Sequence, residues 1–283
     1  MKPRTLDIVA THSILLLMSA IVLYPVLWVL KLALTPGGQL GSDPSAIPLP
    51  SHLDLSNFAA FVLAKDFNGN PLFLYQLGNS LLVSGVATLI GVLFALSAAF
   101  AFSRFAFSGR DSGLKLMLIS QMFPAVVTAV PLIVILDGLG LFGTTAGLVL
   151  IYATASVPFC IWMLKGFFDT IPRDLEESAR LDGAGSFVIF WKIMLPLVRP
   201  GIAVTALFSF MTAWNEFIMA SIFLDDVTRY TLPVTLQQAV GGYDPNWGLF
   251  AAGSLLLSIP VVLVFFFVQR HMVQGLTAGA VKG

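Results

Sequence analysis

Long apolar stretches separated by short polar segments dominate the sequence. A bilayer core needs about 20 mostly apolar residues per helix, and six stretches meet that requirement. The six predicted spans are Ile8–Leu34, Leu77–Phe102, Leu116–Leu136, Ala146–Leu164, Gly201–Leu224 and Gly248–Val268. The first stretch exceeds the roughly 7–15 residues of a secretory-signal core, so we expect it to remain in the membrane. The pattern predicts an all-α membrane protein with one transmembrane domain over residues 1–283.

Composition supports this interpretation and excludes several other classes of protein. The chain is 57% hydrophobic and 11% charged, whereas soluble domains are about 25% charged. Its net charge of zero argues against nonspecific binding of nucleic acid, which depends on concentrated Lys and Arg. The single cysteine, Cys160, excludes a disulfide within the chain.

The common catalytic, metal-binding and phosphate-binding motifs are missing from the sequence. There is no phosphate-binding glycine loop, HExxH, paired CxxC or GxSxG pattern. The histidines, His12, His52 and His271, are scattered, so we expect no metal site. We therefore expect no enzyme activity, catalytic residue or cofactor site in this chain, and either transport or a role in membrane scaffolding or signalling remains.

The distribution of Lys and Arg predicts the orientation. With a cytoplasmic N-terminus, all of the 15 Lys and Arg residues except Lys31, Lys65 and Arg229 lie on the cytoplasmic side. Both termini are then cytoplasmic. The outer side receives a loop over residues 36–76, rich in Pro, Gly and Ser in its first half and predicted to be irregular, a short turn over 137–145 and a loop over 225–247.

One cytoplasmic segment, residues 173–196, is unusually charged for this chain. Asp174 and Glu177 have the spacing of an acidic capping box, which predicts a helix that begins near Leu175. Gly183 and Gly185 are expected to end that helix. A second short amphipathic helix then follows until Leu195 and Pro196 break it. Composition alone also allows a simple solvated loop, but the order of residues favours a rigid elbow of two helices.

A polar pair, Asn215 and Glu216, interrupts the fifth predicted span. A charged residue at the centre of a span costs about 2.5–3.5 kcal/mol on insertion scales, so Glu216 should face the bundle interior or a wet cavity. The pair could line a translocation path and bind hydroxyl groups. It could equally join helices of the bundle or bind a partner subunit.

The elbow carries a recognisable signature. Its residues fit the pattern EAA-x3-G-x9-I-x-LP, with serine at the first alanine position. The matching residues are Glu177, Ser178, Ala179, Gly183, Ile193, Leu195 and Pro196. With these residues the chain resembles the permease subunits of bacterial carbohydrate ABC importers. The stretches QMFPAV, KGFFDTI, YTLPVTLQQ, NWGLFAA and GLTAGAVKG extend the resemblance to the importers of maltose and maltodextrin, and the first outer loop departs most from them.

The resemblance implies a type I importer permease of six transmembrane helices in the bacterial inner membrane, surrounded by lipid. Its elbow residues would dock into a cytoplasmic ATPase and couple ATP hydrolysis to transport. The implied partners are a companion permease subunit, an ATPase homodimer that binds ATP and Mg²⁺, and an external solute-binding protein. The implied solute is maltose, maltodextrin or a related oligosaccharide. The alternative is a channel or secondary carrier outside the ABC class, with an incidental elbow.

Two further segments gain roles from the resemblance. Residues 239–248 align with a scoop-like loop that enters the binding protein, although an aromatic anchor at the membrane edge is the alternative. The contact residues would be Gly241, Gly242, Tyr243, Asp244, Pro245 and Trp247. The tail, residues 275–283, would contact the ATPase through Gly275, Leu276 and Lys282, and a disordered end is the alternative.

Overall fold

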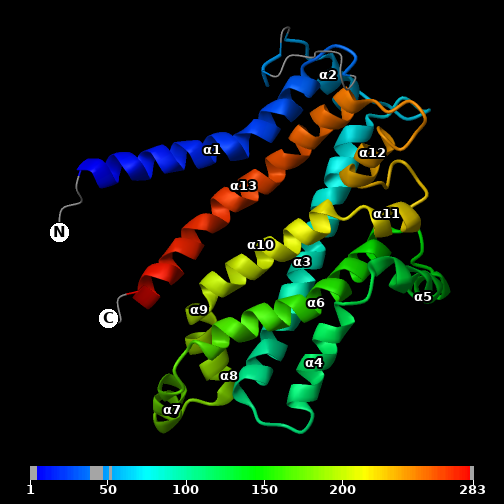
Figure 1. Ribbon diagram of the computed structural model, residues 1–283. Helices are drawn as coiled ribbons and strands as arrows, with labels where there is room; N and C mark the ends of the chain where they lie inside the picture. The colour runs from blue at the N-terminus through cyan, green and yellow to red at the C-terminus, as the bar shows by residue number, and fades with distance from the viewer. Residues whose placement is uncertain (1–4, 39–46, 51–52, 281–283) are drawn as a thin grey trace. The chain divides into compact units, whose positions relative to one another are not determined.

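The computed structural model describes residues 5–38, 47–50 and 53–280, and these form helices without a β-strand (Figure 1). The predicted all-α class is confirmed. The elements are α1 (Thr5–Ala33), α2 (Ser56–Val62), α3 (Leu72–Arg104), α4 (Arg110–Ser120), α5 (Ala125–Gly138), α6 (Thr145–Asp169), α7 (Asp174–Leu181), α8 (Ser186–Val188), the π-helical η1 (Ile189–Met194), α9 (Leu195–Leu197), α10 (Arg199–Asn215), α11 (Ile218–Phe223), α12 (Leu232–Gln238) and α13 (Trp247–Ala280).

Four helices of the described part are long and apolar enough to cross a membrane. They are α1 from Ile8, α3, α6 and α13 as far as Arg270. In this order, the four helices correspond to the first, second, fourth and sixth predicted spans. The segment from α8 to α10 bends by 72° and makes a fifth span if the bent pair counts as one. The number of six spans stays a prediction.

The third predicted span, Leu116–Leu136, is not one continuous helix. It contains the end of α4 and most of α5, with a break at residues 121–124. Pro124 precedes α5 with extended backbone (φ −60°, ψ 132°). Proline has no amide hydrogen and disfavours helical geometry in the residue before it, so the break follows from the sequence.

The fifth predicted span, Gly201–Leu224, is also broken. Helix α10 ends at Asn215, and the short helix α11 begins at Ile218. Glu216 adopts extended backbone (φ −73°, ψ 127°) at the break. Its carboxylate accepts hydrogen bonds from the amides of Met219 and Ala220, at 2.9 and 3.3 Å. The side chain thus satisfies backbone donors that the break leaves without helical partners.

The chain divides into two compact units. One comprises Met1–Leu74 with Thr235–Ile259, and the other comprises Tyr75–Val234 with Pro260–Gly283. In the first unit, the Asn57 side-chain amide donates to the carbonyls of Ala33 and Thr35, both at 3.0 Å. These bonds attach α2 to the end of α1. A Cβ at Gly248 would overlap Asn57, so glycine permits the start of α13 to approach α2 closely.

The first predicted outer loop contains an ordered turn. Asp66 accepts hydrogen bonds from the backbone amides of Asn68 and Asn70, at 2.9 and 2.7 Å. Its other oxygen accepts from the Asn70 side chain at 2.8 Å. The hydrogen bonds from Asn70 hold the pKa of the exposed Asp66 carboxyl below its usual value, because they favour the ionised form. This part of the loop is therefore not irregular.

The second unit is built around α6. Helix α6 packs along α10 and also contacts α4. Gly201 of α10 allows this packing, because a Cβ there would overlap the ring of Phe167. Gly91 of α3 likewise permits close approach to Ser156 of α6. Two buried apolar clusters lie in this unit, one including α11 and the other including η1.

Candidate functional site

The elbow is a defined corner between two helical segments. Its first helix, α7, ends where Gly183 adopts the left-handed conformation with φ of +85°. The amide of Gly183 donates to the carbonyl of Arg180 at 3.0 Å, and the amide of Ala184 donates to the carbonyl of Ala179 at 2.9 Å. This is the Schellman arrangement that ends a helix at glycine. The glycine corner expected from the sequence is present.

Two details of the predicted elbow are wrong. Helix α7 begins at Asp174 without a side-chain cap, so the expected capping box of Asp174 and Glu177 does not form. The second helical segment also continues past Pro196, because α9 extends to Leu197 and the sharp bend follows at Val198. Pro196 lies directly after the change from π-helical η1 to α9.

A buried ion pair attaches α7 to the end of α3. The Arg104 guanidinium contacts the Glu176 carboxylate, and the two side chains are only 5% and 7% exposed. Arg104 also donates to the carbonyl of Ile171 at 2.8 Å. Next to it, Ser103 donates to Asp169 at 2.6 Å, and Lys165 pairs with the same carboxylate at 2.6 Å. The buried ion pair therefore holds α7 to α3, and the bond from Ser103 to Asp169 holds α3 to the end of α6.

The second half of the elbow is anchored by apolar packing. Ile189 and Met194 of η1 are at most 1% exposed and pack in a cluster with Leu164 and Phe168 of α6. The elbow is thus fixed at both halves, by an ion pair in α7 and by buried side chains in η1. Figure 1 shows α7 beyond the end of α6. Such a segment moves with the helices that hold it.

The signature residues differ in exposure. Glu177, Ser178 and Gly183 are exposed. The other four are half-buried, namely Ala179, Ile193, Leu195 and Pro196. The first group is thus free to contact another protein, and the second supports the elbow from within.

The sequence interpretation missed four residues in or next to the elbow. Arg104 and Glu176 form the buried pair, and nothing in one sequence links positions so far apart. Leu181 and Phe187 are 89% and 75% exposed and flank the glycine corner. An apolar residue on a short charged helix could have been noticed as a signal, because exposed large apolar side chains mark contact surfaces.

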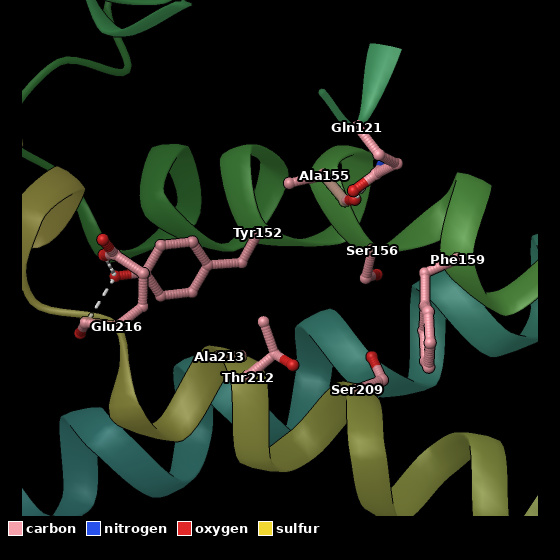
Figure 2. A pocket seen from close by; sticks show the side chains of 9 residues that line it. All are labelled: Gln121, Tyr152, Ala155, Ser156, Phe159, Ser209, Thr212, Ala213 and Glu216. Atoms are coloured by element: carbon pink, nitrogen blue, oxygen red, sulfur yellow. Dashed lines mark hydrogen bonds between the residues drawn. The ribbon is translucent and has the colours of Figure 1, made fainter. Parts of the chain in front are cut away.

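A second candidate site is a cavity of about 260 Å³ in the second unit (Figure 2). Helices α6 and α10 supply most of its walls, and Gln121 joins from the break after α4. The cavity is lined by Gln121, Tyr152, Ala155, Ser156, Phe159, Ser209, Thr212, Ala213 and Glu216. Its lining combines hydroxyl, amide and carboxylate groups with one phenyl ring.

The structure separates the predicted pair of Asn215 and Glu216. Asn215 is exposed, does not line the cavity, and donates its side-chain amide to the Met211 carbonyl at 2.8 Å. Glu216 lines the cavity and accepts the hydroxyl hydrogen of Tyr152 from α6. Glu216 therefore joins α6 to the break after α10 and also presents its carboxylate at the cavity wall. A role of either residue in a translocation path stays a prediction.

The loop at residues 239–248 is compact. Its ends meet where the amide of Asn246 donates to the Ala239 carbonyl at 2.8 Å. Tyr243 at its tip is fully exposed, with Gly241, Gly242 and Asp244 also exposed, whereas Pro245 and Trp247 are half-buried. Trp247 packs edge-on against Phe250 at 6.1 Å. The proposed contact with a binding protein stays a prediction, as does that of the tail, whose Lys282 lies outside the described residues.

Apolar helices long enough to cross a membrane define the class of protein as an integral membrane protein, with a charged elbow between two of its helical segments. A family described as "Binding-protein-dependent transport system inner membrane component" matches residues 87–278. The chain belongs to this family, and its resemblance to the permeases of ABC importers is confirmed. The family is one of inner-membrane components, in agreement with the predicted membrane.

Full-length relatives support the assignment. The galactooligosaccharide transport system permease protein GanQ of Bacillus subtilis is 35% identical, over 99% of this chain and 97% of its own length. The maltose/maltodextrin transport system permease protein MalG of Escherichia coli is 36% identical, over 100% and 98%. A solved bacterial ABC transporter that imports alginate has the same fold, with a TM-score of 0.73 and 21% identity over 95% of this chain and 98% of its own.

Removal of Arg104 is expected to destabilise the second unit strongly. Arg104→Met leaves the Glu176 carboxylate buried without its partner, which costs about 3–5 kcal/mol. The matched control is Lys165→Met, which breaks the more exposed pair with Asp169 and should cost about 0–1 kcal/mol. Thermal unfolding of the purified protein in detergent measures both. The double variant Arg104→Met, Glu176→Leu should recover part of the loss, and equal losses for the two single variants would contradict a structural role of the buried pair.

Two glycines of the elbow offer a second matched test. Gly183→Ala forces a side chain into left-handed backbone and should cost about 1–2 kcal/mol. Gly185→Ala should be nearly neutral, since its φ of −72° suits any residue and a Cβ there meets no atom. A Cβ at Gly183 also meets no atom, so backbone strain alone separates the variants. Unfolding in detergent compares them, and equal stability would show that the corner does not require glycine.

Proposed function

We propose that this chain is the permease subunit of an ATP-driven importer that brings an oligosaccharide from an external binding protein into the cytoplasm. The observation that carries the proposal is the elbow, which is fixed to α3 by Arg104 and Glu176 and exposes Glu177 and Ser178. A segment that is anchored on one side and exposed on the other transmits the movement of a partner to the bundle. A flexible loop would absorb that movement.

The partners proposed are those implied by the resemblance. A companion permease subunit would complete the path, and an ATPase homodimer would receive the elbow and bind ATP and Mg²⁺. An external solute-binding protein would deliver the sugar. One similar solved structure is a bacterial alginate ABC transporter in complex with an alginate pentasaccharide-bound periplasmic protein. Both termini of this chain would then lie in the cytoplasm, as the distribution of Lys and Arg predicts.

The proposed solute is maltose, maltodextrin or a related oligosaccharide. Support comes from relatives that are about one-third identical over their full length, whose names specify galactooligosaccharides in one case and maltose or maltodextrin in others. The relatives share the chemical class of a neutral, hydroxyl-rich chain of sugar rings. The cavity between α6 and α10, whose mainly apolar lining carries several acceptor groups, is compatible with such a solute.

Copurification and reconstitution test the proposal. The chain, expressed with its genomic neighbours and purified from membranes, should carry a stoichiometric ATPase, and vesicles should take up sugar only with ATP and the binding protein. Glu177→Lys should lower uptake at least tenfold while the complex still assembles, because the reversed charge lies on the exposed side of α7. Uptake without ATP, or a complex without an ATPase, would favour a carrier or channel instead.

The proposed contact of the loop at residues 239–248 with the binding protein is tested by a deletion. Deletion of Gly241–Pro245 should reduce uptake from the binding protein severalfold, because it removes the exposed tip with Tyr243. The subunit should still assemble with its partners, which gel filtration of the purified complex measures. A deletion variant with normal uptake would reject contact of this loop with the binding protein and favour a role at the membrane edge.

A further inference from the structure

The cavity between α6 and α10 has an unequal supply of hydrogen-bond donors and acceptors. Thr212 donates its hydroxyl hydrogen to the carbonyl of Phe208 at 2.9 Å. Ser156 donates to the carbonyl of Ala153 at 2.9 Å. A hydroxyl has one hydrogen but two acceptor lone pairs, so both groups keep acceptor capacity after these bonds. Two of the cavity's hydroxyl groups therefore present acceptors to the cavity.

Gln121 and Glu216 also offer acceptors, and not donors, to the cavity. The Gln121 side-chain amide donates to the carbonyl of Ala155 at 3.1 Å, which leaves its oxygen as an acceptor. Glu216 is an acceptor only, and it already receives hydrogen bonds from Tyr152, Met219 and Ala220. These three donors offset its charge within the wall of the protein. The lining is consequently rich in acceptors, and its carboxylate already has donors of its own.

Ser209 adds a buried group without a good partner. Its side chain is 2% exposed, and its hydroxyl makes no well-formed hydrogen bond within the described residues. The neighbouring thiol of Cys160 is a weak hydrogen-bonding group. In Figure 2 the hydroxyls of Ser209 and Ser156 point toward each other across the space between the helices. A buried polar group without a partner is costly, so a ligand hydroxyl that reaches it would be bound favourably.

An aromatic ring closes one end of the cavity. Phe159 lines it and is 38% exposed. The ring of Phe208 packs edge-on against Phe159, with 6.3 Å between the ring centroids. A phenyl face presents an apolar surface to the C–H groups of a sugar ring, while the hydroxyl groups at the ring edge point away toward polar partners.

We propose that this cavity is a subsite for a single sugar ring, bound through hydroxyl hydrogens that Ser156, Thr212 and Gln121 accept, with Phe159 against the apolar face of the ring. The inference rests on the proposed function and specifies the part of the solute that this chain contacts. The volume of about 260 Å³ lies below the roughly 300–1,000 Å³ of pockets that enclose a whole ligand, so one ring fits and the rest of an oligosaccharide extends outside.

Matched threonine variants test the subsite in the complete transporter. Thr212→Val removes a hydroxyl that lines the cavity and should reduce the rate of sugar uptake about 3- to 10-fold, the value of one hydrogen bond. Thr154→Val is the control, because Thr154 is also exposed, also donates to a carbonyl four residues earlier, at 2.8 Å, and does not line this cavity. Phe159→Leu should reduce uptake by at least as much as Thr212→Val. Uptake is measured in vesicles with ATP and saturating sugar-loaded binding protein.

A substrate series identifies the direction of the hydrogen bond. Analogues of the transported sugar with one hydroxyl replaced by fluorine lose a donor and keep a weak acceptor. One such analogue should be transported more slowly by the wild type, and Thr212→Val should not slow it further. If every analogue is slowed by Thr212→Val as much as the parent sugar, Thr212 does not accept a hydroxyl hydrogen and the subsite is wrong.

The outcomes separate this inference from the proposed function. A wild-type complex that takes up no sugar with ATP contradicts the proposed function and the subsite together. A wild type that transports while Thr212→Val and Phe159→Leu match it contradicts only the subsite.

Discussion

The ion pair between Arg104 and Glu176 is the contact on which the mechanical interpretation depends. Without it, α7 would be held within the second unit by its short connections and by the apolar packing of Ala179 and η1. Burial of both charges raises the penalty for separating them, because neither ion would regain full hydration within the fold. The additional bond from Arg104 to the Ile171 carbonyl fixes the guanidinium in one orientation. The elbow is therefore held in one position relative to α3.

A second constraint acts at the interruption between α10 and α11. Backbone groups within a membrane must find partners inside the protein, since lipid tails offer none. Glu216 meets this constraint with its carboxylate, which accepts from two amides of α11 and from the hydroxyl of Tyr152. The same arrangement opens a cavity next to the interruption. A residue that stabilises an irregular helix end thus also shapes the wall of a binding space, so the two roles considered for Glu216 do not exclude each other.

The sequence predicted the features that depend on local chemistry. Apolar length identified the membrane class and the long helices, and glycine at position 183 identified the corner. Apolar length alone predicted continuous spans across Pro124 and Glu216, although both residues mark places where the helices break. The sequence interpretation also missed the pair of Arg104 and Glu176 and the cavity lined by Ser156 and Ser209. These features arise where α3, α6 and α10 meet, and no local pattern specifies which faces of separate helices come together.

Helix α6 connects the two candidate sites within the second unit. Tyr152 and Ser156 lie at the cavity, and Asp169 lies at the end of α6 that precedes the elbow, about 25 Å away from Tyr152 at 1.5 Å per residue. A helix of this length transmits displacement along its axis but bends where its hydrogen-bond ladder is interrupted. Pro158 is such a point, since it lacks the amide hydrogen of an internal helical residue. It lies within the stretch of α6 that lines the cavity, between Ser156 and Phe159. A change of angle at Pro158, driven by movement at Asp169, would therefore shift Phe159 relative to Tyr152 and Ser156 and change the shape of the cavity.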